Sequence, residues 1–268
     1  MTDDIKFVIS SDQHFPAQND RMIKLYFNVI KWFKPQQIDI LGDTSDQACY
    51  SKYNDGSTDE FFNMIRKTPE ESPMPFVEEN ERGAREFFET HRKMFPDADI
   101  FTALGNHDIR VFDYMDKKAP GWVKEVTPER LWGLDNLGID YIFYNDLPRK
   151  RWGNVYGHHG LSALKGGGDS VRSDMNNLGV SLIRGHSHRA ATIYETYELR
   201  NERMIGMEIG HMADVKHPLM SYTNLHQWQL AFVVGHITNG QPYFNLVDVH
   251  EASDGSLSCW VEGKFFTS

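Results

Sequence analysis

The stretch Ile100-Phe101-Thr102-Ala103-Leu104-Gly105-Asn106-His107-Asp108 shows the pattern on which the fold of this chain is built. A short, mostly apolar run is followed at once by glycine and then by polar side chains. Such a run is typical of a buried strand, and the glycine allows a tight turn and a close approach of the backbone. We therefore predict a strand over 100–104 whose carboxyl end presents polar groups.

An apolar run followed by polar residues occurs twice earlier in the chain, the second time with glycine in between. The run Phe7-Val8-Ile9-Ser10 is followed by Asp12-Gln13-His14, and Ile38-Asp39-Ile40-Leu41 is followed by Gly42-Asp43. Between these runs, apolar residues recur at helical spacing: Met22, Tyr26, Val29, Ile30 and Phe33. Strand, helix and strand in this order predict a parallel sheet with a crossover helix.

Two further polar groups follow apolar runs. His158-His159 comes after a strand predicted at 155–157, and Gly185-His186-Ser187-His188 follows a run that ends at Arg184. Beyond residue 190 the pattern favours antiparallel strands, with a hairpin turn at Asn239-Gly240. We predict an α/β fold in a single domain over residues 1–268.

Residues 46–100 differ from the rest because they are polar, with amphipathic patches. We predict a largely helical insertion that forms a lid over the active site. Its aromatic residues could stack on a base or form a small hydrophobic cluster; they are Tyr50, Tyr53, Phe61 and Phe62.

The polar groups are expected to meet at one place, because the carboxyl ends of neighbouring strands in an open α/β sheet converge on one crevice. Asp12 and His14 are two residues apart, as are His186 and His188, so each pair can share a face of extended chain. Each group alone is a weak signal, with Gly-Asn-His-Asp the most specific of them. Together, carboxylates, imidazoles and an asparagine without thiolate favour Mn, Fe or Zn, and they are too many ligands for one ion.

The overall composition limits the function further. The 268 residues carry a formal net charge of -10, which disfavours non-specific binding to duplex nucleic acid, whereas a metal centre could still attract a small anion locally. No run is long enough for a membrane span, the start is not a signal peptide, and the two cysteines suggest no disulfide scaffold. We expect a cytoplasmic protein that does not bind membranes; its oligomeric state stays open.

The complete set resembles the calcineurin-like metallophosphoesterase superfamily from residue 6 to about residue 190. The family signature runs D-x-H, G-D, G-N-H-D/E, H and G-H-x-H. It stands here as Asp12/His14, Gly42-Asp43, Gly105-Asn106-His107-Asp108, His158 and Gly185-His186-Ser187-His188. The resemblance implies a two-sheet α/β/β/α sandwich and a metal-dependent phosphoric ester hydrolase. The segment 208–214 resembles a motif of phage-encoded members.

The resemblance also implies roles for single residues. Asp12, His14 and His188 would hold one divalent ion. Asn106, His158 and His186 would hold the other, and Asp43 would bridge them. His159 competes with His158 for its position, and we prefer His158. The ions are expected to be Mn²⁺, with Fe, Zn or Ni as alternatives, and they would activate a water molecule for attack on phosphorus.

Other residues have two interpretations each. His107 would protonate or stabilise the leaving group, and Asp46 would either orient His107 or be exposed. Phosphoprotein phosphatases carry arginine where this chain has Gln47, so Arg110 would either replace that arginine at the substrate phosphate or face solvent. His211 is either a substrate or second-layer residue or a structural histidine. The glycines at 166–168 either bind phosphate or precede a helix.

The function predicted from these features is hydrolysis of a phosphate ester, of a nucleotide or another small phosphorylated substrate. A nuclease or DNA phosphodiesterase is the alternative, and a Ser/Thr protein phosphatase is weakened by Gln47. The same metal centre serves monoesters and diesters, so the choice between them stays open.

Overall fold

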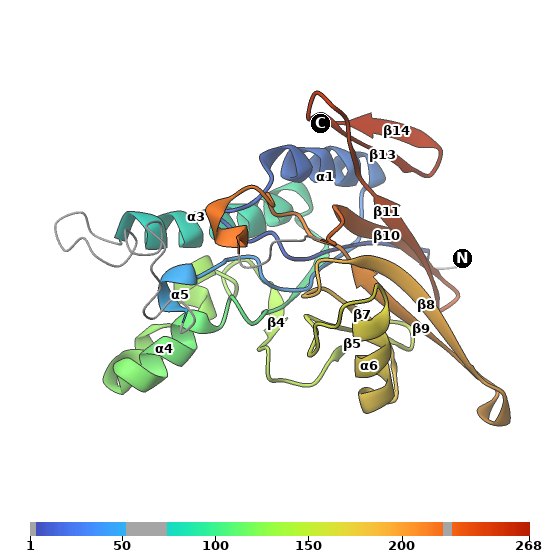
Figure 1. Cartoon of the computed structure of the whole chain (residues 1–268), viewed down its shortest axis with the longest axis horizontal. Coiled ribbons are helices and arrows are strands. Elements are labelled where there is room, and N and C mark those ends of the chain that lie inside the picture. The colour runs from blue at the N-terminus through green and yellow to red at the C-terminus, as the bar shows by residue number, and fades with distance from the viewer. Residues whose placement is uncertain (1–3, 52–73, 222–226) are drawn as a thin grey trace.

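Two β-sheets pack face to face with helices on their outer faces in the computed structural model, which describes residues 4–51, 74–221 and 227–268 (Figure 1). The first sheet has the strand order β11 (Gln241–Asp248), β10 (Ala231–Thr238), β1 (Ile5–Ser10), β2 (Gln37–Ile40), β3 (Asp99–Ala103) and β4 (Asp140–Ile142). The second has the order β5 (Arg149–Trp152), β6 (Val155–His158), β7 (Ser181–Arg184), β9 (Glu202–Ile209) and β8 (Ala190–Tyr197). A small third sheet contains β12 (His250–Glu251), β13 (Leu257–Val261) and β14 (Lys264–Thr267).

The helices connect and cover these sheets. They are α1 (Asp20–Phe33), α3 (Met74–Met94), α4 (Arg110–Lys118), α5 (Pro128–Trp132) and α6 (Asp169–Leu178). Single 3-10 turns are η1 (Ala48–Tyr50), η3 (Pro120–Glu125), η4 (Glu198–Arg200) and η5 (Pro218–Met220). Within the described ranges, no helix combines the length and the apolar character that a membrane crossing requires.

The strand directions confirm the predicted fold class. The strands β1, β2, β3 and β4 are parallel neighbours, and β10 runs antiparallel to both β1 and β11. In the second sheet β9 is antiparallel to β8 but parallel to β7. The parallel strands at the start of the chain and the antiparallel hairpins beyond residue 190 are therefore both as predicted.

Apolar side chains fill three layers, one between the sheets and one on each outer face. Phe7 and Ile9 of β1 point between the sheets, whereas Val8 points to the helix side, as the alternation of side chains along a strand requires. Both faces of β1 are thus buried, which explains why its sequence is a continuous apolar run. On the far side, α6 buries Val171 and Met175 against the second sheet.

The helix α3 covers the first sheet beside α1. The Tyr26 hydroxyl and His91 Nε2 are 2.9 Å apart, and Phe87 packs on both rings. The described part of the predicted 46–100 insertion therefore covers the sheet. Residues 52–73, which include Tyr53, Phe61 and Phe62, lie outside the described residues, so the predicted lid stays a prediction.

The glycines at 166–168 precede α6. The carboxylate of Glu208 in β9 accepts hydrogen bonds from the backbone N–H groups of Gly168 (2.9 Å) and Val171 (3.2 Å). A carboxylate at this position satisfies free N–H groups of the first turn and complements the helix dipole. The Glu208 carboxylate thus takes the N–H groups at the start of α6 that a bound phosphate would need. This favours the interpretation of 166–168 as a helix start over that of a phosphate-binding loop.

Candidate metal centre

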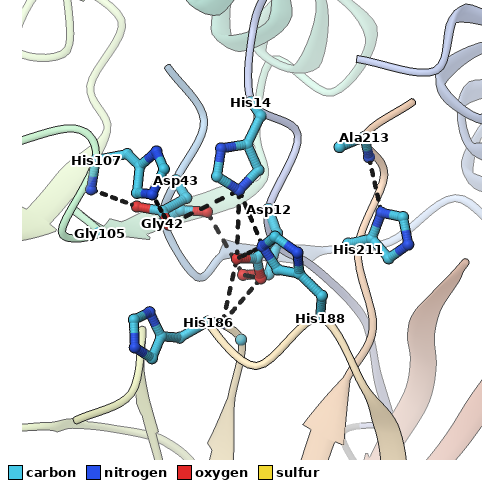
Figure 2. Close-up of polar contacts among 12 residues, drawn as sticks. Asp12, His14, Gly42, Asp43, Gly105, His107, His186, His188, His211 and Ala213 are labelled. Carbon is cyan, nitrogen blue, oxygen red and sulfur yellow. Dashed lines mark hydrogen bonds and ion pairs between the residues drawn. The ribbon is translucent and has the colours of Figure 1, made fainter. Parts of the chain in front are cut away.

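The loops that follow β1, β2, β3, β6 and β7 meet at one edge of the two sheets. Figure 2 shows Asp12, His14, Asp43 and His188 gathered at one place with His107 beside them, whereas the ring of His186 lies on the other side of its backbone. These residues come from segments far apart in the sequence. The convergence expected from the carboxyl ends of neighbouring strands is therefore observed.

Strained backbone holds these side chains in place. The φ angle is positive at five of the candidate ligands: Asp12 (56°), His14 (56°), Asp43 (49°), His186 (70°) and His188 (58°). Non-glycine residues rarely adopt this conformation, and it costs roughly 1–3 kcal/mol each. Such strain persists where the surrounding structure imposes it, and it commonly marks functional sites.

Glycines make room for this arrangement. A Cβ atom on Gly105 would collide with the side-chain Oδ1 and the backbone N of Asp43, and one on Gly185 would meet Ser11 and Asp12. The close backbone approach predicted for Gly105 is confirmed, and Gly185 makes a similar one.

We expect Gly105→Ala to lower the thermal stability and to displace Asp43. The added methyl group has no space, and overpacking of this kind costs about 1–3 kcal/mol, which lowers the unfolding midpoint by roughly 2–10 °C. The control is Gly121→Ala, because a Cβ there has no neighbour within 4 Å. Thermal unfolding followed by circular dichroism compares the two, and equal midpoints would contradict this role of Gly105.

Asp12, His14 and His188 form the first candidate ligand group. One ligand atom from each lies within 4.8 Å of the others. His188 Nε2 is 3.1 Å from Asp12 Oδ1, and the Nε2 atoms of His14 and His188 are 3.0 Å apart. The other carboxylate oxygen of Asp12 accepts hydrogen bonds from the Ser11 hydroxyl (2.6 Å) and the backbone N–H of His186 (2.9 Å).

Asp43, His159 and His186 form the second group, again with ligand atoms within 4.8 Å of one another. His159 Nε2 is 3.1 Å from Asp43 Oδ2 and 3.2 Å from Asn106 Oδ1. The same Asp43 oxygen is 3.8 Å from His14 Nε2, in the first group. Asp43 therefore lies between the two groups, where the sequence predicted a bridging carboxylate.

The structure reverses the preference for His158 over His159. His158 Nε2 donates to the backbone oxygen of Tyr144 (3.1 Å), and its Nδ1 accepts from Gly160 N–H (3.0 Å). Both ring nitrogens of His158 are thus engaged away from Asp43. Successive residues at a strand end point in opposite directions, so His159 is the one that reaches Asp43 and Asn106.

Buried charges of both signs shape the electrostatics of the centre. Burial alone would raise the pKa of Asp43, but the imidazoles of His159 and His107 bring it below its usual range. Burial would lower the pKa of His14, yet hydrogen bonds to Asp12 and Asp46 raise it to about 10. Carboxylates and imidazoles are thus packed together in a buried region, where each favours the charged form of the other.

This donor set fits divalent metal ions. Carboxylate oxygens and imidazole nitrogens converge in overlapping groups: Asp43 belongs to the group with His159 and His186 and also to a group with His14 and His107, and no thiolate is among them. Nitrogen and oxygen ligands of this kind suit Mn, Fe or Zn. The His and Asp groups of this chain can therefore hold metal ions.

Asp46 and Arg110 both hold His107. Asp46 Oδ2 accepts from Nδ1 of His107 (2.9 Å) and from Nδ1 of His14 (3.0 Å), and Asp46 is buried, which excludes the alternative of an exposed Asp46. Arg110 donates to the backbone oxygen of Asp46 (2.9 Å) and to His107 Nε2 (2.8 Å). Arg110 therefore lies at the centre and does not face solvent as an ordinary helix residue. Burial lowers the pKa of His107 to about 4, and Arg110 adds to this effect.

Two residues at the centre had no role assigned from the sequence: Asp108, which belongs to the Gly-Asn-His-Asp motif, and Trp228, which no motif contains. The carboxylate of Asp108 accepts the backbone N–H groups of Gly105 and Ser45, each at 2.8 Å, and so ties the β3 loop to the β2 loop. Trp228 packs on the His188 ring at a centroid distance of 4.3 Å. No periodic pattern marks Trp228, so only the fold places it here.

His211 lies behind His188. Its ring centroid is 5.4 Å from that of His188, its Nδ1 accepts from the backbone N–H of Ala213 (3.1 Å), and the residue is buried (Figure 2). This position favours support of His188 over direct contact with a substrate.

Arg184 links the loop after β6, which carries His159, to the loop after β7, which carries His186. The side chain is fully buried, and it donates to Asp174 (2.8 Å), to the backbone oxygen of Ser162 (2.6 Å) and to that of Gly185 (3.2 Å). It thereby links the chain after His159 to the chain before His186.

We expect Arg184→Met to destabilise the protein by roughly 3–5 kcal/mol, because the substitution leaves the buried carboxylate of Asp174 without its cation. Urea unfolding measures this change. Arg200→Met is the control, since that side chain is 60% exposed and its ion pair contributes little. A similar small loss in both variants would contradict the assigned role of Arg184.

Comparisons with known proteins agree with this fold. No family model matches the sequence. The chain is 26% identical to the gene 54 protein of Mycobacterium phage L5 over 237 residues, which cover 85% of this chain and 88% of that protein. It is also 26% identical to the gene 54 protein of Mycobacterium phage D29 over 219 residues, which cover 79% of this chain and 80% of that protein. The crystal structure of Chaetomium thermophilum Vps29 superposes with a TM-score of 0.50 at 11% identity, covering 98% of this chain and 97% of that one.

The likeness to Vps29 concerns the fold, because the sequences are too different to carry more. The chain has the two-sheet sandwich of the metallophosphoesterase type, and it carries His and Asp groups that can hold metal ions at the edge where the strands end.

Proposed function

We propose that this protein is a metal-dependent phosphoesterase that hydrolyses the phosphate ester of a nucleotide or another small phosphorylated substrate. The observation that carries this proposal is the pair of adjacent ligand groups with Asp43 between them, where its Oδ2 atom lies 3.1 Å from His159 Nε2 and 3.8 Å from His14 Nε2. A single structural ion would need only one such group.

The proposed ligands of one ion are Asp12, His14 and His188, and those of the other are Asn106, His159 and His186, with Asp43 contributing to both. Mn²⁺ is the proposed ion, because all these donors are oxygen or nitrogen. When bound, the ions would offset the charge of the phosphoryl oxygens and activate a water molecule for attack.

The remaining residues position the ester. Arg110 presents a guanidinium group beside His107, where it can pair with a phosphoryl oxygen. Asp46 keeps the Nδ1 proton of His107 pointing away from the substrate, so Nε2 is the nitrogen that can interact with the leaving group. Asp46 also orients His14 through the same carboxylate oxygen.

The test is hydrolysis of p-nitrophenyl phosphate and bis-p-nitrophenyl phosphate by metal-stripped protein, before and after addition of Mn²⁺. We expect turnover only after the ion is added, and the preferred ester separates phosphomonoesterase from phosphodiesterase. Parallel additions of Zn²⁺, Fe²⁺ and Ni²⁺ rank the ions. Turnover with none of them, at any pH between about 6 and 9, would overturn the proposal.

A further inference from the structure

The helix α4 begins directly at the candidate metal centre and leads away from it. Arg110, its first residue, contacts Asp46 and His107. Tyr114 is four residues further on, so it lies on the same face of the helix, one turn beyond Arg110. A molecule that reaches Arg110 along this face therefore passes Tyr114.

The segment from Asp46 to Tyr50 also runs from the centre and contacts this face of α4. The turn η1 follows Asp46 closely, and its last residue, Tyr50, packs against Tyr114 with ring centroids 5.4 Å apart and planes tilted by 55°. The two tyrosines thus form one aromatic surface, although they come from different segments. We call Tyr50 and Tyr114 the tyrosine pair.

Exposure increases from the centre toward Tyr114, the outer member of the tyrosine pair. The side chain of His107 is 11% exposed and that of Arg110 is 19% exposed, whereas Tyr114 is 41% exposed. A substrate whose phosphate lies at the metal centre could therefore extend along α4 toward solvent, with its other end beside the two tyrosine rings.

The protein groups that a substrate would meet change from the charged guanidinium of Arg110 to the neutral rings of the tyrosine pair. Arg110 suits a phosphoryl oxygen, which it can bind through two N–H groups. Burial raises the pKa of Tyr50, and the neighbouring Cys49 and Glu81 raise it further, so its ring stays a neutral phenol. The carboxylate of Glu81 would repel a second anionic group here, but it would not repel a neutral base.

We propose that the tyrosine pair binds the nucleobase of a nucleotide whose phosphate lies at Arg110 and the metal centre. This inference rests on the proposed phosphoesterase function and names the substrate class for it. Stacking on an aromatic side chain holds any base, so the pair selects for a base without reading its identity.

The test compares adenosine 5'-monophosphate with ribose 5-phosphate, which has the same sugar phosphate but no base. Each is measured as a competitive inhibitor of Mn²⁺-dependent hydrolysis of whichever nitrophenyl ester the protein prefers. We expect the nucleotide to bind at least about fivefold more tightly than ribose 5-phosphate. Tyr114→Leu and Tyr50→Leu should each reduce this ratio, while the inhibition constant of ribose 5-phosphate changes by less than about twofold.

Two further variants make the test specific. Tyr114→Phe keeps the ring and should retain the ratio, and Tyr243→Leu removes a tyrosine that is 60% exposed on β11 and should leave the ratio unchanged. Equal inhibition by the two compounds in a wild-type protein that hydrolyses the ester would overturn the tyrosine pair and leave the proposed function standing. An unchanged ratio in Tyr114→Leu and Tyr50→Leu would do the same. Absence of Mn²⁺-dependent turnover in the wild type would overturn both.

Discussion

Replacement of Asp43 with asparagine is expected to lower Mn²⁺-dependent ester hydrolysis by at least about 100-fold. Asp43 Oδ2 lies 3.1 Å from His159 Nε2 and 3.8 Å from His14 Nε2, so this one carboxylate serves both ligand groups. Asparagine keeps the shape and can still accept the hydrogen bond from the backbone N–H of His107. It removes the negative charge and replaces one ligating oxygen with an amide nitrogen, which does not bind a divalent ion.

The measurement is kcat/KM for the preferred nitrophenyl ester in the presence of saturating Mn²⁺. Asp113→Asn is the matched control, because it makes the same chemical change on α4 at a side chain that is 60% exposed. A folded Asp43→Asn protein with more than about a tenth of wild-type activity would show that the carboxylate does not bridge two ions.

His159→Asn is expected to lower both Mn²⁺ affinity and activity by at least about tenfold, whereas His158→Asn should change either by less than about threefold. The asparagine amide at 159 can still donate to the backbone oxygen of Leu41, as Nδ1 does, but no atom takes the place of Nε2 beside Asp43. At 158, the asparagine oxygen can still accept from Gly160 N–H, as Nδ1 does. The two variants therefore differ mainly in the nitrogen that faces the centre.

Mn²⁺ affinity is measured by calorimetric titration of each metal-stripped variant, so the comparison does not depend on turnover. Equal losses of Mn²⁺ affinity in the two variants would show that both substitutions disturb the loop after β6 and that His159 is not specifically a ligand. A larger loss in His158→Asn would restore the assignment made from the sequence and contradict the structural one.

The sequence did not predict correctly which of His158 and His159 faces the centre. The polar group after β6 was identified correctly, because the apolar run before it marks the strand. Which of two adjacent histidines faces the centre depends on the phase of the strand at its last residue, and a shift of one residue exchanges the two faces. That phase is set by the pairing of β6 with β7, which no local pattern in the sequence specifies.

The fold was more predictable than the surroundings of the site. Strands β1, β2 and β3 are buried on both faces, so their apolar runs are strong local signals, as are Gly42 after β2 and Gly105 after β3. Trp228 and Tyr114 come to the site from segments with no such signal. Their positions follow from long-range packing, because Trp228 rests on His188 and Tyr114 rests on Tyr50.

We propose that this fold holds two ions through one shared carboxylate, and the stoichiometry of bound Mn²⁺ distinguishes this centre from a single-ion site. Metal-stripped wild-type protein is dialysed to equilibrium against increasing Mn²⁺, and bound metal is measured by elemental analysis. The proposed centre predicts saturation at two ions per chain, with Asp43→Asn weakening both. Saturation at one ion per chain or fewer, or binding that Asp43→Asn leaves unchanged, would contradict it.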